Sequence, residues 1–510
     1  MKAFLMYQDR DLDRGEKAST RTRALERDLD LGRVCTAMAA SDPYLQSTAE
    51  QSLRAPLGTA ADIIYRQRIL IDVLEKPEVA RGLYTLAEET VTAEKKIYRG
   101  NFFSYPDAVL RRSIESLELL IVMLRRLRAI AEEHGTEFSS PGFSRFFAMI
   151  TRELDEDYFQ LIAGHLKELR LRHGVMVSAS LGYANNGGGY TLRRPNPREG
   201  NWVQRIYRKP TESYSFEINP RDEAGARALS ALHNQSVALA AHALDVSDSH
   251  ILSFFTMLRA ELAFYIGCLN LREALAANAG PICFPKPERK EANELGAHGL
   301  YDLSLALTGA PSVVGNDLYA EGKNLIMVTG ANEGGKSTFL RSLGAAQLMM
   351  QCGMFVCADY FSSSISAEIH THFKREEDAE LNSGKLDEEL ERMSGIADTI
   401  SPHSLVLFNE SFSATNEREG SAIARNIISA LVESRMRVVF VTHFFDLSHG
   451  LWDQHLPGAL FLQAQREEGG RRTHRIVEGE PASTSYGEDL YAQVFGAAAA
   501  GASGPVGENR

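Results

Sequence analysis

Apolar residues recur at intervals of three and four positions along three stretches of the first 290 residues. From Pro106 to Gly135 they alternate with Arg and Glu, which predicts one long amphipathic helix with proline near its start and glycine after its end. The same period predicts a second helix from Glu153 to His173 and a third from about Glu223 to Ala277. The third is longer than most globular helices, so it indicates either a lever or a broken pair of core helices.

A different pattern separates the second and third helices. Apolar and small polar residues alternate from Val175 to Ser180, which predicts a strand. The run from Asn185 to Gly189 consists of two asparagines and three glycines, which is typical of a turn. We therefore predict a small β-rich insert with a flexible tip over about residues 174–220.

Beyond residue 290 the pattern changes to short apolar runs separated by helical stretches. Leu325–Val328, Leu405–Phe408 and Val438–Val441 each predict a buried strand, and Ala422–Glu433 predicts a helix. Buried strands that alternate with helices indicate a parallel sheet with crossover connections. The predicted domains are a mainly helical region over 1–290 that includes the β-rich insert, an α/β domain over 291–497, and a disordered tail over 498–510.

Composition narrows the class of protein. With 510 residues, of which 44% are hydrophobic, the chain has room for roughly two to four folded units. No run of about eighteen apolar residues is present and charged residues stand near the N-terminus, so we expect a cytoplasmic protein without membrane contact. The five cysteines include no C-x-x-C pair, which argues against a disulfide framework and a zinc site.

One segment departs from the acidic net charge of −12, which otherwise excludes a uniformly basic surface for nucleic acid. Between His165 and Pro210 there are nine Lys or Arg residues and two Glu residues, and nine minus two gives a local charge of +7. Aromatic residues lie among these charges, as in segments that follow a phosphate backbone. A solvated loop without a ligand explains the charges equally well. The candidate DNA-binding residues are Arg193, Arg194, Arg205, Arg208 and Lys209.

A phosphate-binding pattern follows the first predicted strand of the α/β region. Residues 330–338 are GANEGGKST, which matches GxxxxGK[ST], and a helical run comes next. Glycines let backbone N–H groups surround a phosphate, and a helix N-terminus adds positive potential. We expect ATP to bind with Lys336 on the β and γ phosphates and Ser337 on Mg²⁺. The predicted nucleotide-binding residues are Gly330, Asn332, Gly334, Gly335, Lys336, Ser337 and Thr338.

Polar residues follow the next two predicted strands. Glu410 is the candidate general base, a role that is typically worth roughly 10²- to 10⁴-fold in rate. Asn409 precedes it where an aspartate is expected; it offers Mg²⁺ an oxygen but no charge, which predicts weaker magnesium affinity or slower turnover. His443, after the third strand, is a candidate donor to the γ-phosphate, although a histidine at a strand end is more often structural.

The order of these elements matches one known family. The segment from Leu300 to Gly487 resembles the ATPase domain of the MutS mismatch-repair family, and the helical part resembles its core, lever and clamp regions more weakly. This resemblance implies an ABC-type ATPase, a homodimer with two shared ATP sites, long helices that couple ATP to a DNA clamp, and repair or recombination partners. It also implies a nucleotide contact at Asn316. The matching segments are Asn316-Asp317, TGANEGGKSTFLR from Thr329, residues 353–358, Ser413–Asn416, Thr442-His443 and Ser485–Gly487.

The sequence departs from that family in three places. No early β-rich segment with a Phe-x-Glu wedge precedes the helices, so we expect no direct mismatch recognition. The loop that contacts the partner's nucleotide aligns with residues 383–388, where Leu386 and Asp387 replace hydroxyl donors. Val313 stands where an aromatic side chain would stack on adenine, which predicts loose base selectivity.

Two further patterns suggest other chemistry. His370 and His372 lie near Glu368 in the pattern of a metal site, but an H-x-H pair on a strand offers no third ligand. Cys352 and Cys357 flank a predicted apolar strand, and we expect them to be buried small hydrophobes rather than redox partners.

The leading hypothesis from the sequence is an ATP-hydrolysing, DNA-binding dimeric clamp that acts in mismatch repair or recombination. The alternative is a nucleotide-gated dimeric scaffold that recruits proteins, hydrolyses little ATP and does not recognise mismatches. Asn409, the altered loop and the acidic net charge favour the scaffold, whereas the basic insert favours the clamp. The sequence also leaves open a role with RNA or ribosomes.

Overall fold

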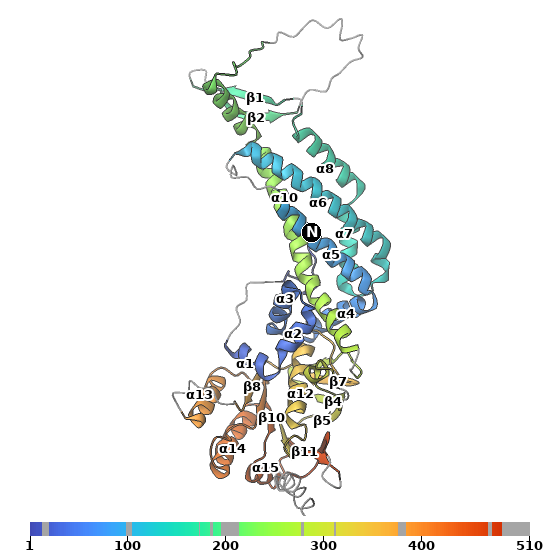
Figure 1. Ribbon diagram of the computed structural model, residues 1–510, viewed down its shortest axis with the longest axis vertical. Coiled ribbons are helices and arrows are strands. Elements are labelled where there is room, and N and C mark those ends of the chain that lie inside the picture. The colour runs from blue at the N-terminus through green and yellow to red at the C-terminus, as the bar shows by residue number, and fades with distance from the viewer. Residues whose placement is uncertain are drawn as a thin grey trace, which may run out of the picture. The chain divides into compact units, whose positions relative to one another are not determined.

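The computed structural model describes residues 1–12, 20–97, 105–172, 174–183, 187–194, 214–276, 280–310, 313–375, 384–467 and 472–481. They form two compact units, whose elements are labelled in Figure 1. The helical unit comprises Met1–Ala3, Glu78–Ser139 and Phe143–Leu262. The α/β unit comprises Phe4–Pro77, Ser140–Gly142 and Ala263–Arg510.

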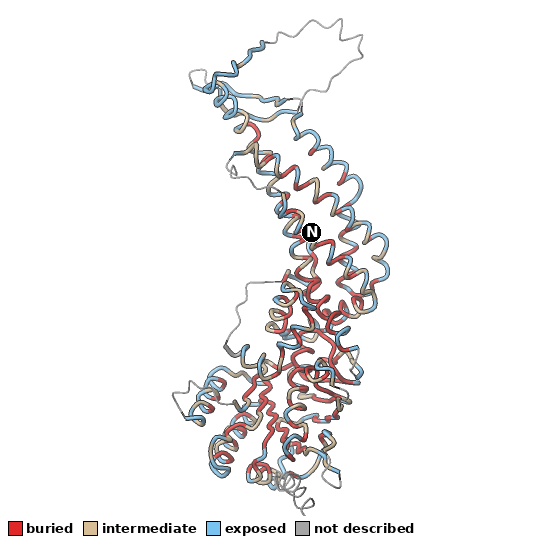
Figure 2. The backbone as a smooth tube through the Cα atoms, viewed as in Figure 1, coloured by how far each residue is buried: buried red, intermediate tan, exposed pale blue. Residues whose placement is uncertain are grey.

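The helical unit is built on amphipathic helices. Buried and exposed positions alternate along α6 (Pro106–His134), which confirms the first predicted helix (Figure 2). The second predicted helix is confirmed as α8 (Glu156–Leu169), although it begins three residues later than predicted, because the Asp155 side chain accepts from the Tyr158 N–H at 2.7 Å and caps it. The remaining helical segments are α5 (Pro77–Lys96), η1 (Gly135–Glu137), α7 (Pro141–Glu153) and α10 (Glu223–Ala276).

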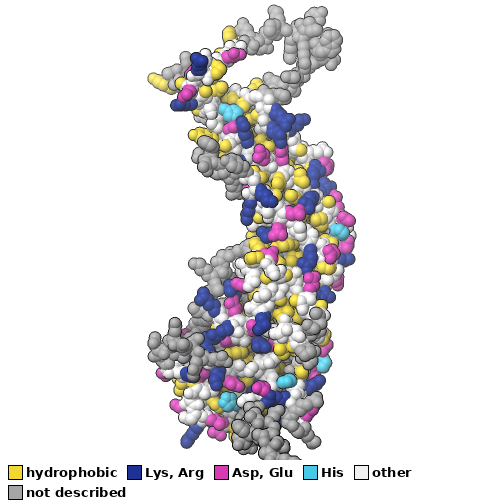
Figure 3. Space-filling view, in the orientation of Figure 1, with side chains coloured by type: hydrophobic (Ala, Val, Ile, Leu, Met, Phe, Trp, Pro, Cys, Tyr) yellow, Lys and Arg dark blue, Asp and Glu magenta, His cyan; other side chains and the backbone are white. Residues whose placement is uncertain are grey.

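Ion pairs cover much of this unit. Basic and acidic side chains lie beside one another over α6 and α8 in the space-filling view (Figure 3). Arg125 in α6 pairs with Glu156 at 3.0 Å, and Arg170 pairs with Glu118 at 2.6 Å. Pairs of this kind at the surface contribute little to folding, so the buried apolar stripes hold the helices together.

The predicted β-rich insert contains a hairpin. β1 (Met176–Leu181) and β2 (Gly187–Arg193) pair antiparallel, with Met176 opposite Arg193. Residues 195–213, which include three of the five candidate DNA-binding residues, lie outside the described residues. The hairpin therefore confirms the strand-rich pattern at the start of the insert.

The third predicted helix is confirmed as one continuous element, α10. Among the described residues, it is the helix that is long and apolar enough to cross a membrane by length and composition. However, 72% of its most apolar stretch is buried inside the protein, as in the core helix of a soluble protein. Its residues contribute to both compact units.

A six-stranded sheet forms the centre of the α/β unit. Its order is β12-β11-β6-β10-β9-β8, and its strands are parallel except for β12 at one edge. Three of these strands confirm the predicted apolar runs, since both faces of the sheet are covered and their residues are buried. The strands are β6 (Leu325–Thr329), β8 (Ile369–Phe373), β9 (Leu405–Asn409), β10 (Arg437–Val441), β11 (Ala459–Arg466) and β12 (Arg472–Glu478).

Alternate strand residues face two different helical layers. Val406, Phe408 and Phe440 pack in one cluster with α14 (Glu417–Glu433) and α15 (Phe445–Trp452). On the opposite face lies α12 (Lys336–Gln351), which approaches so closely that a Cβ at Gly344 would lie 2.5 Å from Leu407 Cδ1. This packing fixes α12 against the centre of the sheet. Its first residue, Lys336, belongs to the predicted phosphate-binding loop over residues 330–338, the P-loop.

The N-terminal helices group with the α/β unit in space. The Leu57 N–H donates to Gln351 O at 2.7 Å, and Arg66 donates to Cys352 O at 3.0 Å, so both contact the end of α12. The sequence placed residues 1–77 with the helical region, because helical periodicity does not reveal which later segment buries an apolar face. The elements are α1 (Thr20–Asp28), α2 (Leu31–Ala39), α3 (Pro43–Arg54) and α4 (Ala60–Glu75).

A second sheet of four strands completes the α/β unit in the order β3-β7-β4-β5. Its strand β5 begins at Asn316, and the short helix α11 follows its strand β4. The bounds are β3 (Lys286–Glu288), η3 (Lys290–Ala292), β4 (Leu295–Leu300), α11 (Leu303–Ala306), β5 (Asn316–Tyr319), β7 (Tyr360–Ser364) and α13 (Lys385–Ala397).

Candidate nucleotide-binding site

The P-loop connects β6 to α12, at the carboxyl edge of the sheet. Lys336 is only 4% exposed, and its Nζ donates to Gly330 O at 2.8 Å and to Ala331 O at 2.9 Å. Burial lowers the pKa of Lys336, and the nearby Glu410 carboxylate opposes this shift. A buried ammonium that bonds to neutral carbonyls fits an anionic ligand, because the phosphates would compensate its charge.

Glycine is required at two points in this loop. Gly330 has φ of 117°, and a Cβ there would lie 2.9 Å from the Ala464 backbone N. Gly335 has φ of 94° and forms the N-cap of α12. The loop can therefore turn its N–H groups inward and pack against β11, as a phosphate cradle requires.

Two side-chain oxygens that could hold a magnesium ion meet beside the P-loop. The Ser337 Oγ donates to Asn409 Oδ1 at 2.9 Å, although these residues are far apart in the sequence. The contact arises because α12 begins at the P-loop while β9 ends at Asn409. Hydroxyl and amide oxygens are suitable magnesium ligands, so the two side chains fit the ion expected from the sequence.

Glu410 follows directly after β9 and lines the same cavity as Lys336 and Ser337. Its backbone has φ of 53°, and its N–H donates to Val441 O at 2.9 Å on the neighbouring strand. This bond fixes the direction in which Glu410 leaves the sheet. His443 lies after β10 and is exposed, its ring contacts Phe444, and it is not among the residues that line the cavity.

The cavity has a volume of about 490 Å³, and its lining has two chemically different parts. The P-loop and Glu410 form the part that we call the polar end, whereas the lining residues between Leu300 and Val314 are mostly apolar and form the part that we call the apolar end. Asn316 also lines the cavity and accepts from the Ile476 N–H at 2.7 Å, so its amide oxygen is already engaged by β12. The remaining lining residues are Leu300, Tyr301, Asp302, Leu305, Ala310, Val313, Val314, Phe339, Ser342 and His474.

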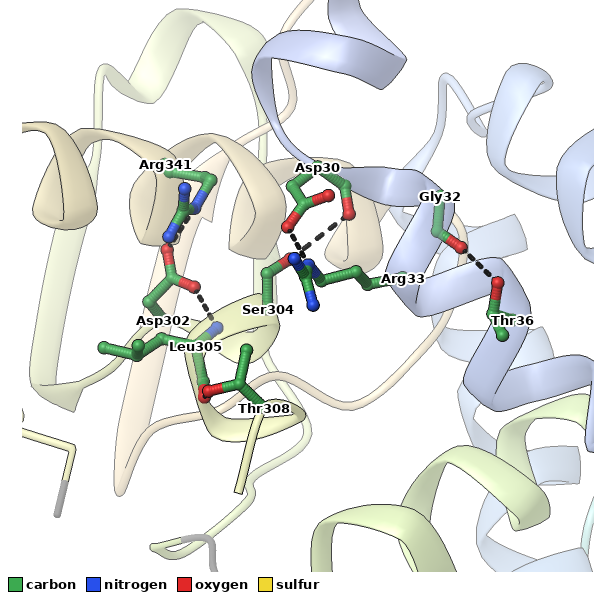
Figure 4. Close-up of polar contacts among 9 residues, drawn as sticks. All are labelled: Asp30, Gly32, Arg33, Thr36, Asp302, Ser304, Leu305, Thr308 and Arg341. Carbon is green, nitrogen blue, oxygen red and sulfur yellow. Dashed lines mark hydrogen bonds and ion pairs between the residues drawn. The ribbon is translucent and has the colours of Figure 1, made fainter. Parts of the chain in front are cut away.

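The apolar wall is tied to its surroundings through α11, as Figure 4 shows. Asp302 accepts from the Leu305 N–H at 2.7 Å and from Arg341 Nε of α12 at 2.6 Å. Ser304 donates its hydroxyl to Asp30 O, next to α2, at 3.2 Å. The wall is thus bound on one side to the P-loop helix and on the other to the N-terminal helices.

The alternative metal site is not supported by the geometry. The His370 Nε2 lies 2.9 Å from Glu368 Oε2, whereas His372 is buried, with Nε2 donating to Glu389 O at 3.0 Å. Burial lowers the pKa of His372 to about 4. Across the described part of the chain, no three His, Cys, Asp or Glu side chains gather as metal ligands.

The two candidate cysteines are both buried, and burial raises the pKa of each thiol to about 12, as expected for structural residues. The apolar strand predicted between them is wrong as a strand. Val356 forms one isolated bridge with Cys283, because the chain leaves α12 through a turn at Gly353 with φ of 75°.

Only part of the predicted basic cluster lies in the described residues. Arg193 donates to Ser178 Oγ at 2.8 Å across the hairpin, and Arg194 pairs with Glu168 at 2.8 Å. Arg205, Arg208 and Lys209 lie outside the described residues, as does Ser383 of the altered loop. Leu386 and Asp387 lie in the first turn of α13.

The structure also brings residues to the site that sequence reasoning missed. The hairpin of β11 and β12 supports the P-loop through Ala464, and His474 of β12 lines the cavity. Arg341 reaches the wall from α12. The edge strand β12 has no local motif, so its role could be found only from the fold.

Comparison with known families supports the domain pattern. A family model described as the MutS2 N-terminal domain matches residues 58–278, and a model described as MutS domain V matches residues 326–497. The second match includes the P-loop, Asn409 and Glu410. The first spans most of the helical region and its β-rich insert.

Individual relatives match about a third of the chain. "MutS protein homolog 4" of Mus musculus is 32% identical over 151 residues, which are 30% of this chain and 16% of the mouse protein. "DNA mismatch repair protein MutS" of Thermus thermophilus is 34% identical over 166 residues, or 32% of this chain and 20% of that protein. "Endonuclease MutS2" of the same species is 30% identical over 185 residues, or 36% of this chain and 24% of that protein. The chain thus matches less than a quarter of each relative's length, but two successive family models and these similarities agree that it belongs to the MutS family.

Proposed function

We propose that this chain is a cytoplasmic, Mg²⁺-dependent ATPase that acts as a dimeric DNA clamp in mismatch repair or recombination. The observation that supports the ATPase most directly is the contact between Ser337 and Asn409 at 2.9 Å, beside a cavity that Lys336 and Glu410 line. Its residues come from the P-loop and the end of β9. This convergence supplies phosphate binding, metal binding and a base at one point.

Each residue of the site has a separate role in ATP binding or hydrolysis, which follows from its chemistry. The P-loop N–H groups and the Lys336 ammonium bind the phosphates, which replace Gly330 O and Ala331 O as the acceptors of Lys336. Ser337 and Asn409 would hold Mg²⁺, which supplies positive charge to the phosphate oxygens when it is bound. Glu410 accepts the proton of the attacking water. The apolar end of the cavity receives the base.

Mutation of the two charged groups tests the ATPase. Lys336→Ala should abolish ATP binding, because it removes the buried cation. Glu410→Gln should bind ATP at nearly wild-type affinity but hydrolyse it about 10²- to 10⁴-fold more slowly. Calorimetry and a phosphate-release assay measure the two properties. Glu433→Gln, at an exposed position at the end of α14, is the matched control. Wild-type turnover in Glu410→Gln would show that the base is another residue.

The DNA clamp is supported by the hairpin and by the relatives. Arg193 and Arg194 lie at the end of β2, and the exposed Arg194 is held by an ion pair that a phosphate can replace. Two relatives are named as a DNA mismatch repair protein and an endonuclease. ATP turnover measured with duplex, mismatched, branched and single-stranded DNA would identify the preferred structure. Equal turnover with every DNA and with none would reject DNA coupling.

A nucleotide-gated scaffold is the second candidate, and Asn409 favours it. This residue places a neutral amide beside Ser337, so the site has less negative charge to hold Mg²⁺ than a carboxylate would provide. If slow hydrolysis is built into the chain, Asn409→Asp should raise turnover and lower the Mg²⁺ concentration needed for half-maximal activity. Fast wild-type hydrolysis that DNA stimulates further would exclude the scaffold.

A further inference from the structure

The phosphate-binding loop contains a carboxylate. Glu333 lies between Asn332 and Gly334 and lines the cavity. Its backbone is left-handed, with φ of 60°, and its side chain is 72% exposed. A negative charge at this place repels the triphosphate that the surrounding loop attracts. The loop therefore needs a means to offset it.

An arginine from a distant strand meets this carboxylate. Arg472 is the first residue of β12, and its guanidinium donates to Glu333 Oε2. The Arg472 side chain is 31% exposed, so it is more enclosed than its partner. An ion pair with such exposure contributes little to the stability of the fold, so its main effect is on the charge beside the cavity.

The hairpin that supplies Arg472 is firmly placed against the loop. A Cβ at Gly334 would lie 2.8 Å from Ala464 Cβ of β11, and one at Gly335 would lie 3.3 Å from His474 O of β12. On the other side, the Ile476 N–H donates to Asn316 Oδ1 at 2.7 Å. These close approaches fix where Arg472 stands relative to the P-loop.

We propose that Arg472 is a positioning residue for nucleotide binding, which neutralises Glu333 and holds its carboxylate away from the phosphates. This inference rests on the proposed ATP-binding function and assigns a role to β12 in it. Arg472 acts through Glu333 and does not itself bind a phosphate. Its removal should therefore matter only while Glu333 carries a charge.

A double-mutant cycle on ATP affinity tests this proposal. Calorimetry on the full chain would compare wild type, Arg472→Gln, Glu333→Gln and the double variant. We expect roughly tenfold weaker ATP binding in Arg472→Gln, because one uncompensated charge then faces several phosphate charges. Glu333→Gln should bind at least as tightly as wild type, and the double variant should return to within about twofold of it.

Two further measurements test whether the loss of ATP affinity comes from the charge of Glu333. Arg475→Gln removes an exposed positive charge from the same strand and should leave ATP affinity unchanged. The loss in Arg472→Gln should be largest for ATP, smaller for ADP and absent for adenosine, and it should shrink as salt is raised. Circular dichroism would establish that each variant folds.

Three other results would contradict either this proposal alone or the proposed function as well. A double variant as weak as Arg472→Gln would mean that Arg472 contacts the phosphates directly, and the proposal would be wrong. Unchanged ATP affinity in Arg472→Gln, with wild type binding ATP normally, would also overturn it while leaving the proposed function intact. Wild-type protein that binds no nucleotide would overturn the proposed function together with this inference.

Discussion

Lys336 is 4% exposed and donates to two carbonyl oxygens, whereas the Arg194 side chain in the helical unit is 70% exposed and pairs with Glu168. Burial lowers the pKa of Lys336, and the hydrogen bond that Arg194 donates to Glu168 raises the pKa of Arg194. Two further residues show the same contrast. His372 is buried in the α/β unit and donates to Glu389 O, while Arg170 of the helical unit forms a surface pair with Glu118.

This difference indicates where the replacement of a single residue should change ligand binding. A buried charge without a counter-charge gains much from a ligand of opposite sign, so the loss of one group removes binding. Exposed charges are screened by salt and act together, so the loss of one has a small effect. Nucleotide binding in the cavity is therefore expected to depend on individual residues. DNA binding by the β1–β2 hairpin is expected to depend on how many positive charges it carries.

The largest effect outside the cavity is expected at His372, through pH. The folded pKa is about 4 against an ordinary value of 6.5, so the folded state binds fewer protons than the unfolded state between these values. Stability should therefore fall as the pH falls from about 6.5 to 4, by roughly 3 kcal/mol from this group alone. His372→Gln should reduce that pH dependence, although the lost contact with Phe412 lowers stability at pH 7 as well.

Urea unfolding at pH 7 and at pH 4.5 measures this dependence. His242→Gln is the matched control, because it makes the same replacement at an exposed position of α10. An unaltered slope in His372→Gln would show that buried histidine in the α/β unit does not behave differently from exposed histidine in the helical unit.

A smaller effect is expected at the hairpin. Replacing Arg193 and Arg194 by Ala removes two candidate phosphate contacts, which should weaken DNA binding about tenfold at low salt. The slope of log affinity against log salt should fall by about 1.8. Arg126 and Arg152 are exposed in other helices. Replacing both by Ala removes the same charge and should have little effect on DNA binding. Equal losses in both variants would mean that only the net charge matters.

The sequence predicted the nucleotide site where neighbouring residues or strand ends define it. The P-loop is one continuous motif, and Asn409 and Glu410 follow an apolar run that a parallel sheet brings beside it. It did not predict Arg472 or the link between Asp302 and Arg341, because these depend on which distant segments pair. The helix predicted over 153–173 begins at Glu156 for a local reason, since Asp155 is its cap inside an otherwise periodic pattern.

The smallest effect is expected at the apolar end of the cavity, where Val313 lies in the wall. Val313→Phe supplies an aromatic face for the base, and a stacked ring contributes about 0.5 to 1.5 kcal/mol beyond area burial. We therefore expect ATP to bind about three- to tenfold more tightly, as calorimetry would measure. Inorganic tripolyphosphate, which has no base, should bind both proteins equally, so the gain is confined to one end of the cavity. A similar gain for tripolyphosphate would mean that the ring reshapes the P-loop, and the two ends of the cavity would not be independent.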